Sequence, residues 1–143
     1  MNPKLLPYLN FNGQSFEAMK FYQSVLGGQL NMQTFAEAGM PVSDEIKDQI
    51  VHAHLENDWM TIMASDGGEH HQVTMGNSVN LSINGSDEEL LTKIFNGLAE
   101  GGTIDMALEK QFWGDTYGQL TDKFGIHWMV NISSSSKTEN NQN

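Results

Sequence analysis

Two stretches of the chain follow the same plan: LNFNGQSFEAMKFYQSVLGGQLNM (residues 9–32) and LSINGSDEELLTKIFNGLAEGGTIDM (residues 81–106). Each stretch begins with an alternating apolar and polar run, which is typical of a half-buried strand. It then passes through Asn-Gly into a helical pattern, reaches Gly-Gly, and continues as another strand. The repeat predicts two similar halves, each beginning with a strand, a helix and a second strand.

The sequence indicates where the first helix ends and where the second helix begins. The first is expected from about Ser15 to Leu26, where Gly27-Gly28 stops it. The second is expected to begin at a capping box formed by Ser86 and Glu89. Its apolar residues fall at i, i+3, i+4 and i+7, which places on one face Leu91, Ile94, Phe95 and Leu98.

Further strand patterns follow each helix. They are residues 29–35, 50–57 and 59–65 in the first half, and residues 103–110, 116–122 and 127–133 in the second. We align Trp59-Met60 with Trp128-Met129. The chain is therefore predicted to be a single α+β domain, residues 1–133. Its two β-α-β-β-β modules, about residues 1–66 and 74–133, form a curved, mixed or antiparallel sheet with an open cleft. Residues 134–143 contain no apolar side chain and are expected to be a disordered tail.

Composition excludes several kinds of partner and site. The formal net charge is −11, and the seven basic residues are scattered lysines, which argues against a nucleic-acid partner. The chain has no cysteine, so disulfides, thiolate metal sites and a cysteine nucleophile are excluded. It has neither an apolar run long enough to span a membrane nor an export signal, so we expect a cytoplasmic protein.

Alternation assigns side chains to two faces of each sheet. Leu9 and Phe11 are expected to face the helix, as are the apolar residues of a strand starting at Ser78: Val79, Leu81 and Ile83. On the last strand we expect Trp128, Val130 and Ile132 in the core. The opposite faces then carry polar and methionine side chains, a composition that suits a small-molecule cleft. We expect its ligand contacts at Tyr8, Asn10, His52, Met60, Ser78, Asn80, Trp113, Tyr117 and Met129.

The stretch FWGDTYGQLTDKFGIHWMVNI, residues 112–132, is rich in glycine and aromatic residues. We expect residues 122–125 to form a turn over Phe124, and Trp128 to pack in the core. Trp113 and Tyr117 are expected at the mouth of the cleft, with Gly114 and Gly118 allowing the chain to bend. A dimer contact is the alternative role for Trp113.

The paired modules resemble the vicinal oxygen chelate superfamily, which includes glyoxalase I, extradiol dioxygenases and the fosfomycin- and bleomycin-resistance proteins. Residues 7–28, residues 52–66 and the motif at residues 112–132 resemble the PhnB-like branch, whose members are often labelled 3-demethylubiquinone methyltransferase. The sequence lacks the glycine-rich loop of nucleotide-type cofactor sites, which does not support that label. The resemblance also implies a homodimer.

The resemblance places four metal-ligand positions at Leu6, Met60, Ser78 and Met129. None of these is a ligand for a hard divalent ion, so we expect no metal and no other cofactor. His52, His54 and Glu56 alternate on one face and could chelate a metal, although exposed polar side chains are the simpler interpretation. His70 and His71 fall in a loop. His127 is the best candidate for proton transfer, and a histidine bonded to a neighbour is the alternative.

Three functions remain open at this point. The first is a metal-free binder of a small molecule, similar to the bleomycin-resistance proteins. The second is a metal-dependent lyase, isomerase or dioxygenase of the same superfamily with a shifted histidine site. The third is a structural or regulatory dimer.

Overall fold

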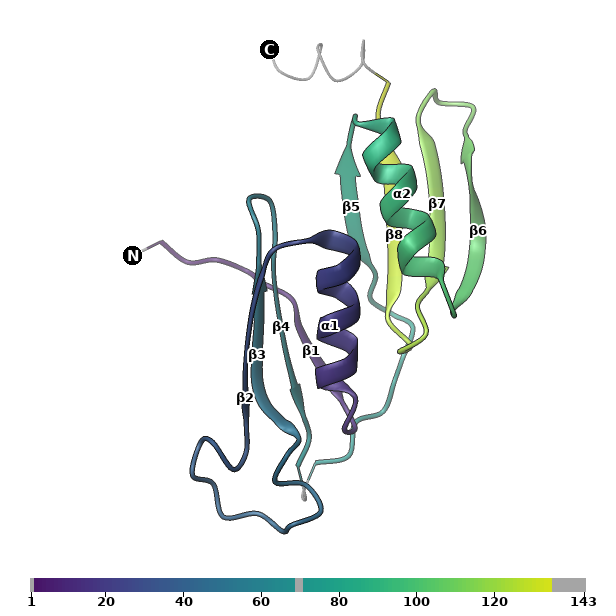
Figure 1. The fold of residues 1–143 in the computed structure, drawn as a ribbon. Helices are drawn as coiled ribbons and strands as arrows, with labels where there is room; N and C mark the ends of the chain where they lie inside the picture. Colours follow the sequence, from purple (N-terminus) through teal and green to yellow (C-terminus); the bar gives the residue numbers. More distant parts are fainter. Residues whose placement is uncertain (1, 69–70, 135–143) are drawn as a thin grey trace. The chain divides into compact units, whose positions relative to one another are not determined.

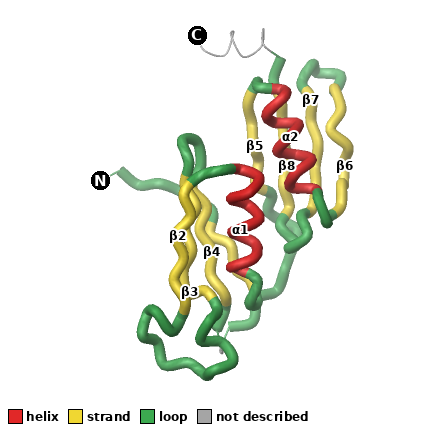
Figure 2. The backbone as a smooth tube through the Cα atoms, viewed as in Figure 1, coloured by secondary structure: helices red, strands yellow, loops and turns green. Residues whose placement is uncertain are grey.

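A computed structural model of the chain describes residues 2–68 and 71–134. The chain forms two compact units, Met1–Thr74 and Met75–Asn143. Each unit contains one helix and one four-stranded sheet (Figures 1 and 2). Neither helix within the described ranges has the length and apolar character that a membrane crossing needs.

The first unit follows the predicted β-α-β-β-β order. Its elements are β1 (Tyr8–Phe11), α1 (Ser15–Leu26), β2 (Gln29–Thr34), β3 (Ile50–Glu56) and β4 (Thr61–Asp66). The strands lie in the order β1-β4-β3-β2, with β1 parallel to β4 and the other pairs antiparallel. The buried apolar side chains of α1 are Ala18, Met19, Tyr22 and Leu26.

The second unit repeats this topology. Its elements are β5 (Leu81–Gly85), α2 (Glu88–Ala99), β6 (Thr103–Lys110), β7 (Thr116–Thr121) and β8 (His127–Ile132). The strands lie in the order β5-β8-β7-β6, with β5 parallel to β8 and the other pairs antiparallel. The predicted fold class is confirmed, because both units follow the β-α-β-β-β order. The predicted face of the second helix is also confirmed, since α2 buries Leu91, Ile94, Phe95 and Leu98.

Strand alternation separates a covered face from an open one. In β1, Leu9 and Phe11 are buried while Tyr8 and Asn10 are exposed. In β8 every second residue is buried, namely Trp128, Val130 and Ile132. One face of each sheet therefore packs against its helix, and the other presents side chains that the unit's own helix does not cover.

The end of α1 and the start of α2 test the expected caps. Gly27 has a φ of 76°, so the predicted glycine stop of α1 is confirmed. The predicted capping box at Ser86 is wrong, because the N-cap of α2 is Asp87. The Asp87 carboxylate accepts a hydrogen bond from the backbone N–H of Leu90 at 3.1 Å. An aspartate next to a serine is an equally good cap, and the sequence alone does not separate the two.

Two expectations about the strands are also wrong. The strand predicted from Ser78 begins only at Leu81, and Val79 is 72% exposed rather than packed under a helix. Trp59 does not correspond to Trp128, because Trp59 lies in the β3–β4 turn and is 50% exposed. The residue that matches Trp128 by strand register is Ile62, since each is the core-facing partner of a buried leucine.

A buried carboxylate fixes how the first unit is assembled. Asp66, at the end of β4, accepts hydrogen bonds through Oδ1 from the backbone N–H groups of Gly13 (2.9 Å) and Ser15 (3.1 Å). The same oxygen accepts the Ser15 hydroxyl at 2.8 Å, and Oδ2 accepts the N–H of Ile50 at 2.9 Å. Asp66 thus joins the start of α1 to the start of β3 through the end of β4.

We expect the substitution Asp66→Asn to lower the free energy of unfolding by about 2–3 kcal/mol, because hydrogen bonds to charged groups contribute at that level. An asparagine amide would also direct a donor at one of these N–H groups. Urea unfolding followed by circular dichroism measures the effect. The exposed Asp58→Asn variant is the control, and equal stability of the two variants would contradict this role for Asp66.

Candidate functional site

The face of the first sheet opposite α1 is almost entirely polar. Register and alternation place eleven side chains on this first open face: Tyr8, Asn10, Gln29, Asn31, Gln33, His52, His54, Glu56, Thr61, Met63 and Ser65. Glu56, the last residue of β3, is the one Asp, Glu or Lys among the eleven. All are at least partly exposed. Mostly amide, hydroxyl and imidazole groups around one thioether make a surface that can orient a small polar molecule.

Tyr8 and His52 form the best-defined contact on the first open face. The Tyr8 hydroxyl lies 3.0 Å from His52 Nδ1, and the two ring centroids are 5.8 Å apart. The two residues come from β1 and β3, which are separated in the sheet by β4. The structure therefore brings together two residues that the sequence predicted as ligand contacts.

The neighbouring His54 has a different environment. Its Nε2 lies 3.9 Å from Glu56 Oε2, and it is the register partner of Met63 on β4. Across residues 2–68 and 71–134, no group of three or more His, Asp and Glu side chains is placed to hold a metal ion.

The four inherited metal positions do not suit a hard divalent ion. Leu6 has no donor atom, and Met60 and Met129 offer soft thioethers. Three of the positions, Leu6, Met60 and Ser78, lie outside the strands, so the inherited alignment is displaced.

Strand register identifies the residue pairs that occupy corresponding positions in the two units. The pair Tyr8 and Met63 of the first unit corresponds to the pair Ser82 and Met129 of the second. This corrected set also lacks His, Asp and Glu. The residues present therefore do not fit the metal centre of the superfamily.

The face of the second sheet opposite α2 has more varied chemistry. Register and alternation place ten side chains on this second open face: Ser82, Asn84, Thr103, Met106, Glu109, Tyr117, Gln119, Thr121, Met129 and Asn131. The Asp105 carboxylate also reaches this face, where it accepts the Thr121 hydroxyl. His127 stands at its edge, opposite Thr121. The predicted contacts Tyr117 and Met129 belong to this face, whereas Ser78 and Asn80 precede β5.

His127 is held at both ring nitrogens. Its Nδ1 lies 2.8 Å from the hydroxyl of Thr121, which in turn donates to Asp105 Oδ2 at 2.7 Å. Its Nε2 lies 3.1 Å from the carbonyl oxygen of Gly76.

The contact to Gly76 defines one of the donors in this network. The role of Nδ1 of His127 toward the Thr121 hydroxyl depends on the tautomer of the imidazole. A carbonyl only accepts, so Nε2 donates to Gly76. With both ring nitrogens in contact with groups of the protein, this arrangement favours a structural role for His127 over proton transfer.

The loop between β6 and β7 carries an aromatic group beside the second open face. Trp113 is 45% exposed, and its ring centroid lies 6.4 Å from that of Tyr117. Gly114 has a φ of 102°, so it permits the expected bend. Gly118 does not serve that purpose, because it lies within β7. A Cβ there would approach Phe95 to 2.8 Å, so its role is close packing against α2.

The turn between β7 and β8 agrees with expectation. Phe124 and Trp128 are buried. Asp122 Oδ1 accepts the backbone N–H groups of Phe124 (2.8 Å) and Ile126 (3.1 Å), and Oδ2 accepts the indole N–H of Trp128 at 2.8 Å. Sequence reasoning did not identify this carboxylate, although Asp at the first position of a tight turn is a usable signal.

Sequence reasoning also missed several residues of the open faces. Met63 was hidden by the incorrect Trp-Met alignment. Asp105, Thr121 and Glu109 were not singled out because their partners depend on the β6–β7 register, which shifts twice between Ile104 and Glu109. Such irregularities have no clear sequence signal.

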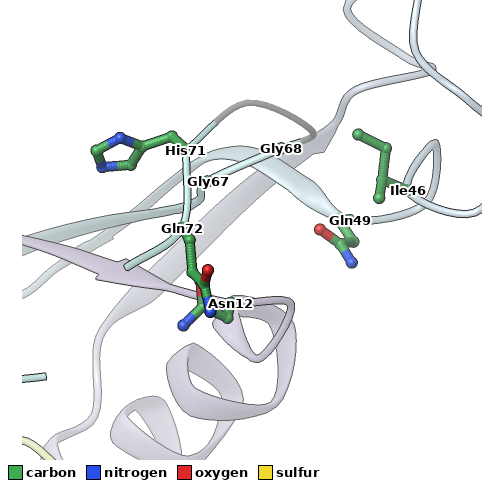
Figure 3. A pocket seen from close by; sticks show the side chains of 7 residues that line it. All are labelled: Asn12, Ile46, Gln49, Gly67, Gly68, His71 and Gln72. Carbon is green, nitrogen blue, oxygen red and sulfur yellow. The ribbon is translucent and has the colours of Figure 1, made fainter. Parts of the chain in front are cut away.

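A small pocket of the first unit is lined by none of the residues of the first open face. Its volume is about 190 Å³, and it is lined by Asn12, Ile46, Gln49, Gly67, Gly68, His71 and Gln72 (Figure 3). The His71 ring points away from Ile46 and Gln49 in this view. The pocket contains no predicted ligand contact, and its wall flanks residues 69–70. Predicted loop residue His70 lies outside the described residues, as does the expected tail beyond Ser134.

Comparison with known proteins supports one family. A family model described as 3-demethylubiquinone-9 3-methyltransferase matches residues 3–131. Protein YjdN from Escherichia coli is 30% identical, over 94% of this chain and 99% of YjdN.

Solved structures agree with this result. Protein PA1353 from Pseudomonas aeruginosa is 36% identical with a TM-score of 0.86, covering 94% of this chain and 100% of that chain. A Bacillus cereus protein described as a putative 3-demethylubiquinone-9 3-methyltransferase, PhnB protein, is 26% identical with a TM-score of 0.76, covering 92% and 100%. A glyoxalase/bleomycin resistance protein/dioxygenase family enzyme from Burkholderia phytofirmans has the same fold, with a TM-score of 0.61 at 19% identity over 90% and 98%.

Proposed function

The chain belongs to the family described as 3-demethylubiquinone-9 3-methyltransferase, a PhnB-like branch of the glyoxalase/bleomycin resistance/dioxygenase superfamily. We propose from this that it binds a small organic molecule on its open sheet faces without a hard divalent metal. The proposed contacts are Tyr8, Asn10 and His52 on the first open face, and Tyr117, Met129 and the adjacent Trp113 for the second. A cleft shared by both halves stays a prediction.

The observation that carries this proposal is the chemistry of the open faces. Charged residues make up 17% of the chain, and a sheet face that only meets water is commonly covered by such residues. The first open face has one, Glu56, and the second has Glu109 together with Asp105, which accepts the Thr121 hydroxyl. Amides, hydroxyls, thioethers and aromatic rings make up most of both faces, which is the composition of small-molecule sites.

Methyl transfer, the activity in the family's description, is not part of this proposal. The sequence has no glycine-rich loop between a strand and a helix of the kind that binds nucleotide-type cofactors. The metal-dependent alternative has no supporting donor set at the inherited positions or at the register-matched ones.

Binding can be tested with a library of small organic fragments screened by ligand-observed NMR. Hits are then titrated while the amide signals of Tyr8, His52, Tyr117 and Met129 are followed. We expect Trp113→Ala to weaken a hit of the second open face by about 1–3 kcal/mol, because a truncated aromatic anchor typically costs this much.

Trp59→Ala is the matched control for this measurement. It removes an indole that is 50% exposed but lies in the β3–β4 turn, so the affinity of the same hits should not change. Fragments that shift no signal on either open face would contradict the proposed function.

The proposal also predicts the metal content of the protein. Untagged protein purified without chelator should contain well under one equivalent of zinc, nickel, iron or manganese, measured by plasma mass spectrometry. It should not convert the hemithioacetal of methylglyoxal. A stoichiometric divalent ion that is lost in His52→Ala or His54→Ala would support the enzyme alternative instead.

We further propose that the protein acts as a homodimer in the cytoplasm. Related proteins with this architecture commonly pair, and closed two-fold assemblies are the usual form of soluble oligomers. Light scattering at micromolar concentration should give twice the 15.9 kDa mass of the chain. A value equal to the monomer mass would rule out a stable dimer at that concentration.

A further inference from the structure

We infer that the second open face is a subsite for an organic cation, a protonated amine carried on an apolar body. This inference rests on the proposed function and specifies the ligand class for that face. It depends on five features: a cross-strand row of acceptors, the orientation of the amides, the aromatic pair, an adjacent row with two methionines, and the placement of the lysines.

One row of side chains crosses all four strands of the second sheet. Asn84 of β5 is the partner of Asn131 of β8, which is the partner of Tyr117 of β7, which is the partner of Glu109 of β6. Partners in adjacent strands lie about 5 Å apart and point to the same side. The row therefore joins two amides, a phenol and a carboxylate within the reach of one small molecule.

The amides of this face donate through their nitrogens to neighbouring side chains. Asn131 Nδ2 donates to Asp115 Oδ2 at 3.1 Å, an orientation that is fixed because a carboxylate only accepts. Gln119 Nε2 donates to the Tyr117 hydroxyl at 2.8 Å, and Asn84 Nδ2 donates to the Ser82 hydroxyl at 3.0 Å.

The amide oxygens are left to meet a ligand. Within residues 2–68 and 71–134, no hydrogen bond reaches the side-chain oxygen of Asn84, Gln119 or Asn131. Together with the Glu109 carboxylate, the face presents mainly acceptors. A molecule that donates several hydrogen bonds is the complement of such a face.

The aromatic pair adds a second attraction for a cation. The rings of Trp113 and Tyr117 are tilted by 58° with centroids 6.4 Å apart, and Trp113 is 45% exposed. A cation over an aromatic face is attracted by the ring quadrupole, most strongly for indole. Glu109, opposite Tyr117, places a negative charge at the same end of the row.

The adjacent row accounts for the apolar body of the ligand. Ser82, Met129, Gln119 and Met106 follow one another across the same four strands. Met129 is partly exposed and Met106 is 45% exposed. Thioether side chains adapt to apolar groups of varied shape, so this row can accept an aliphatic or aromatic chain.

No lysine of the described part of the second unit opposes a cation on this face. Lys110 follows Glu109 in β6 and points to the other side, and Lys93 lies on α2. Lys123 lies in the β7–β8 turn with its Nζ 5.6 Å from the centroid of the Phe124 ring. The net charge of −11 further favours a positively charged ligand over an anion.

The test uses three probes that share one apolar body: 4-phenylbutylamine, 4-phenylbutan-1-ol and 4-phenylbutyrate, with charges of +1, 0 and −1 near neutral pH. Their affinities for the full chain are measured by NMR titration at low and moderate salt. We expect the amine to bind about tenfold more tightly than the alcohol, and the acid to bind most weakly. The preference should shrink as salt is added.

Variants locate the preference on the second open face. Glu109→Gln should reduce the amine-to-alcohol affinity ratio about tenfold, which brings it to unity. Trp113→Leu should also reduce this ratio while keeping an apolar side chain at the position. Glu100→Gln makes the same charge change at the exposed end of α2 and should leave the ratio unchanged. Thermal unfolding of each variant confirms that it is folded.

The outcomes separate this inference from the proposed function. Equal binding of amine and alcohol, tightest binding of the acid, or an amine preference that survives in Glu109→Gln would overturn the cation subsite. Each of these leaves small-molecule binding intact. Failure of all three probes to bind also overturns the subsite, whereas the proposed function is then decided by the fragment screen.

Discussion

The hydrogen bonds to the buried Asp66 carboxylate are the constraint on which the first unit depends. A buried carboxylate is tolerated only when its oxygens are satisfied, and the partners of Asp66 are the backbone at the start of α1 and of β3. The end of β4 and the start of the helix are therefore held at one point. Because the helix must then lie along the covered face, the polar residues of each strand are left on the other side.

The second unit reaches the same arrangement by different contacts. One of the buried carboxylates there, Asp122, organises the β7–β8 turn and accepts the indole N–H of Trp128. In the first unit the equivalent turn is held by Asn57, whose side chain accepts the N–H groups of Trp59 and Met60. Two similar folds thus use a polar side chain at the same turn, but only Asp122 also positions a core side chain.

Much of the fold could be predicted because period-two alternation and the Gly-Gly stops are local signals. The errors arose where identical residue pairs occupy different structural positions in the two units. Trp59-Met60 and Trp128-Met129 look alike, but the first pair lies in a turn and the second in β8. The turns differ in length by one residue, since Asn57 bonds with Met60 where Asp122 bonds with Ile126. Such offsets are set by three-dimensional pairing. The open faces followed from alternation, whereas the Asp105–Thr121–His127 contacts depend on the irregular β6–β7 register.

The environment of His127 bears on the choice between catalysis and binding. A general base needs a ring nitrogen that can accept a proton from a bound molecule. Here Nδ1 faces a hydroxyl whose proton goes to Asp105, and Nε2 faces the carbonyl of Gly76. Using His127 as a base would break at least one of these contacts and release the segment that leads into β5. The beginning of the second sheet is therefore connected to its far edge through one imidazole. That arrangement stabilises a fixed recognition surface and favours binding over proton transfer.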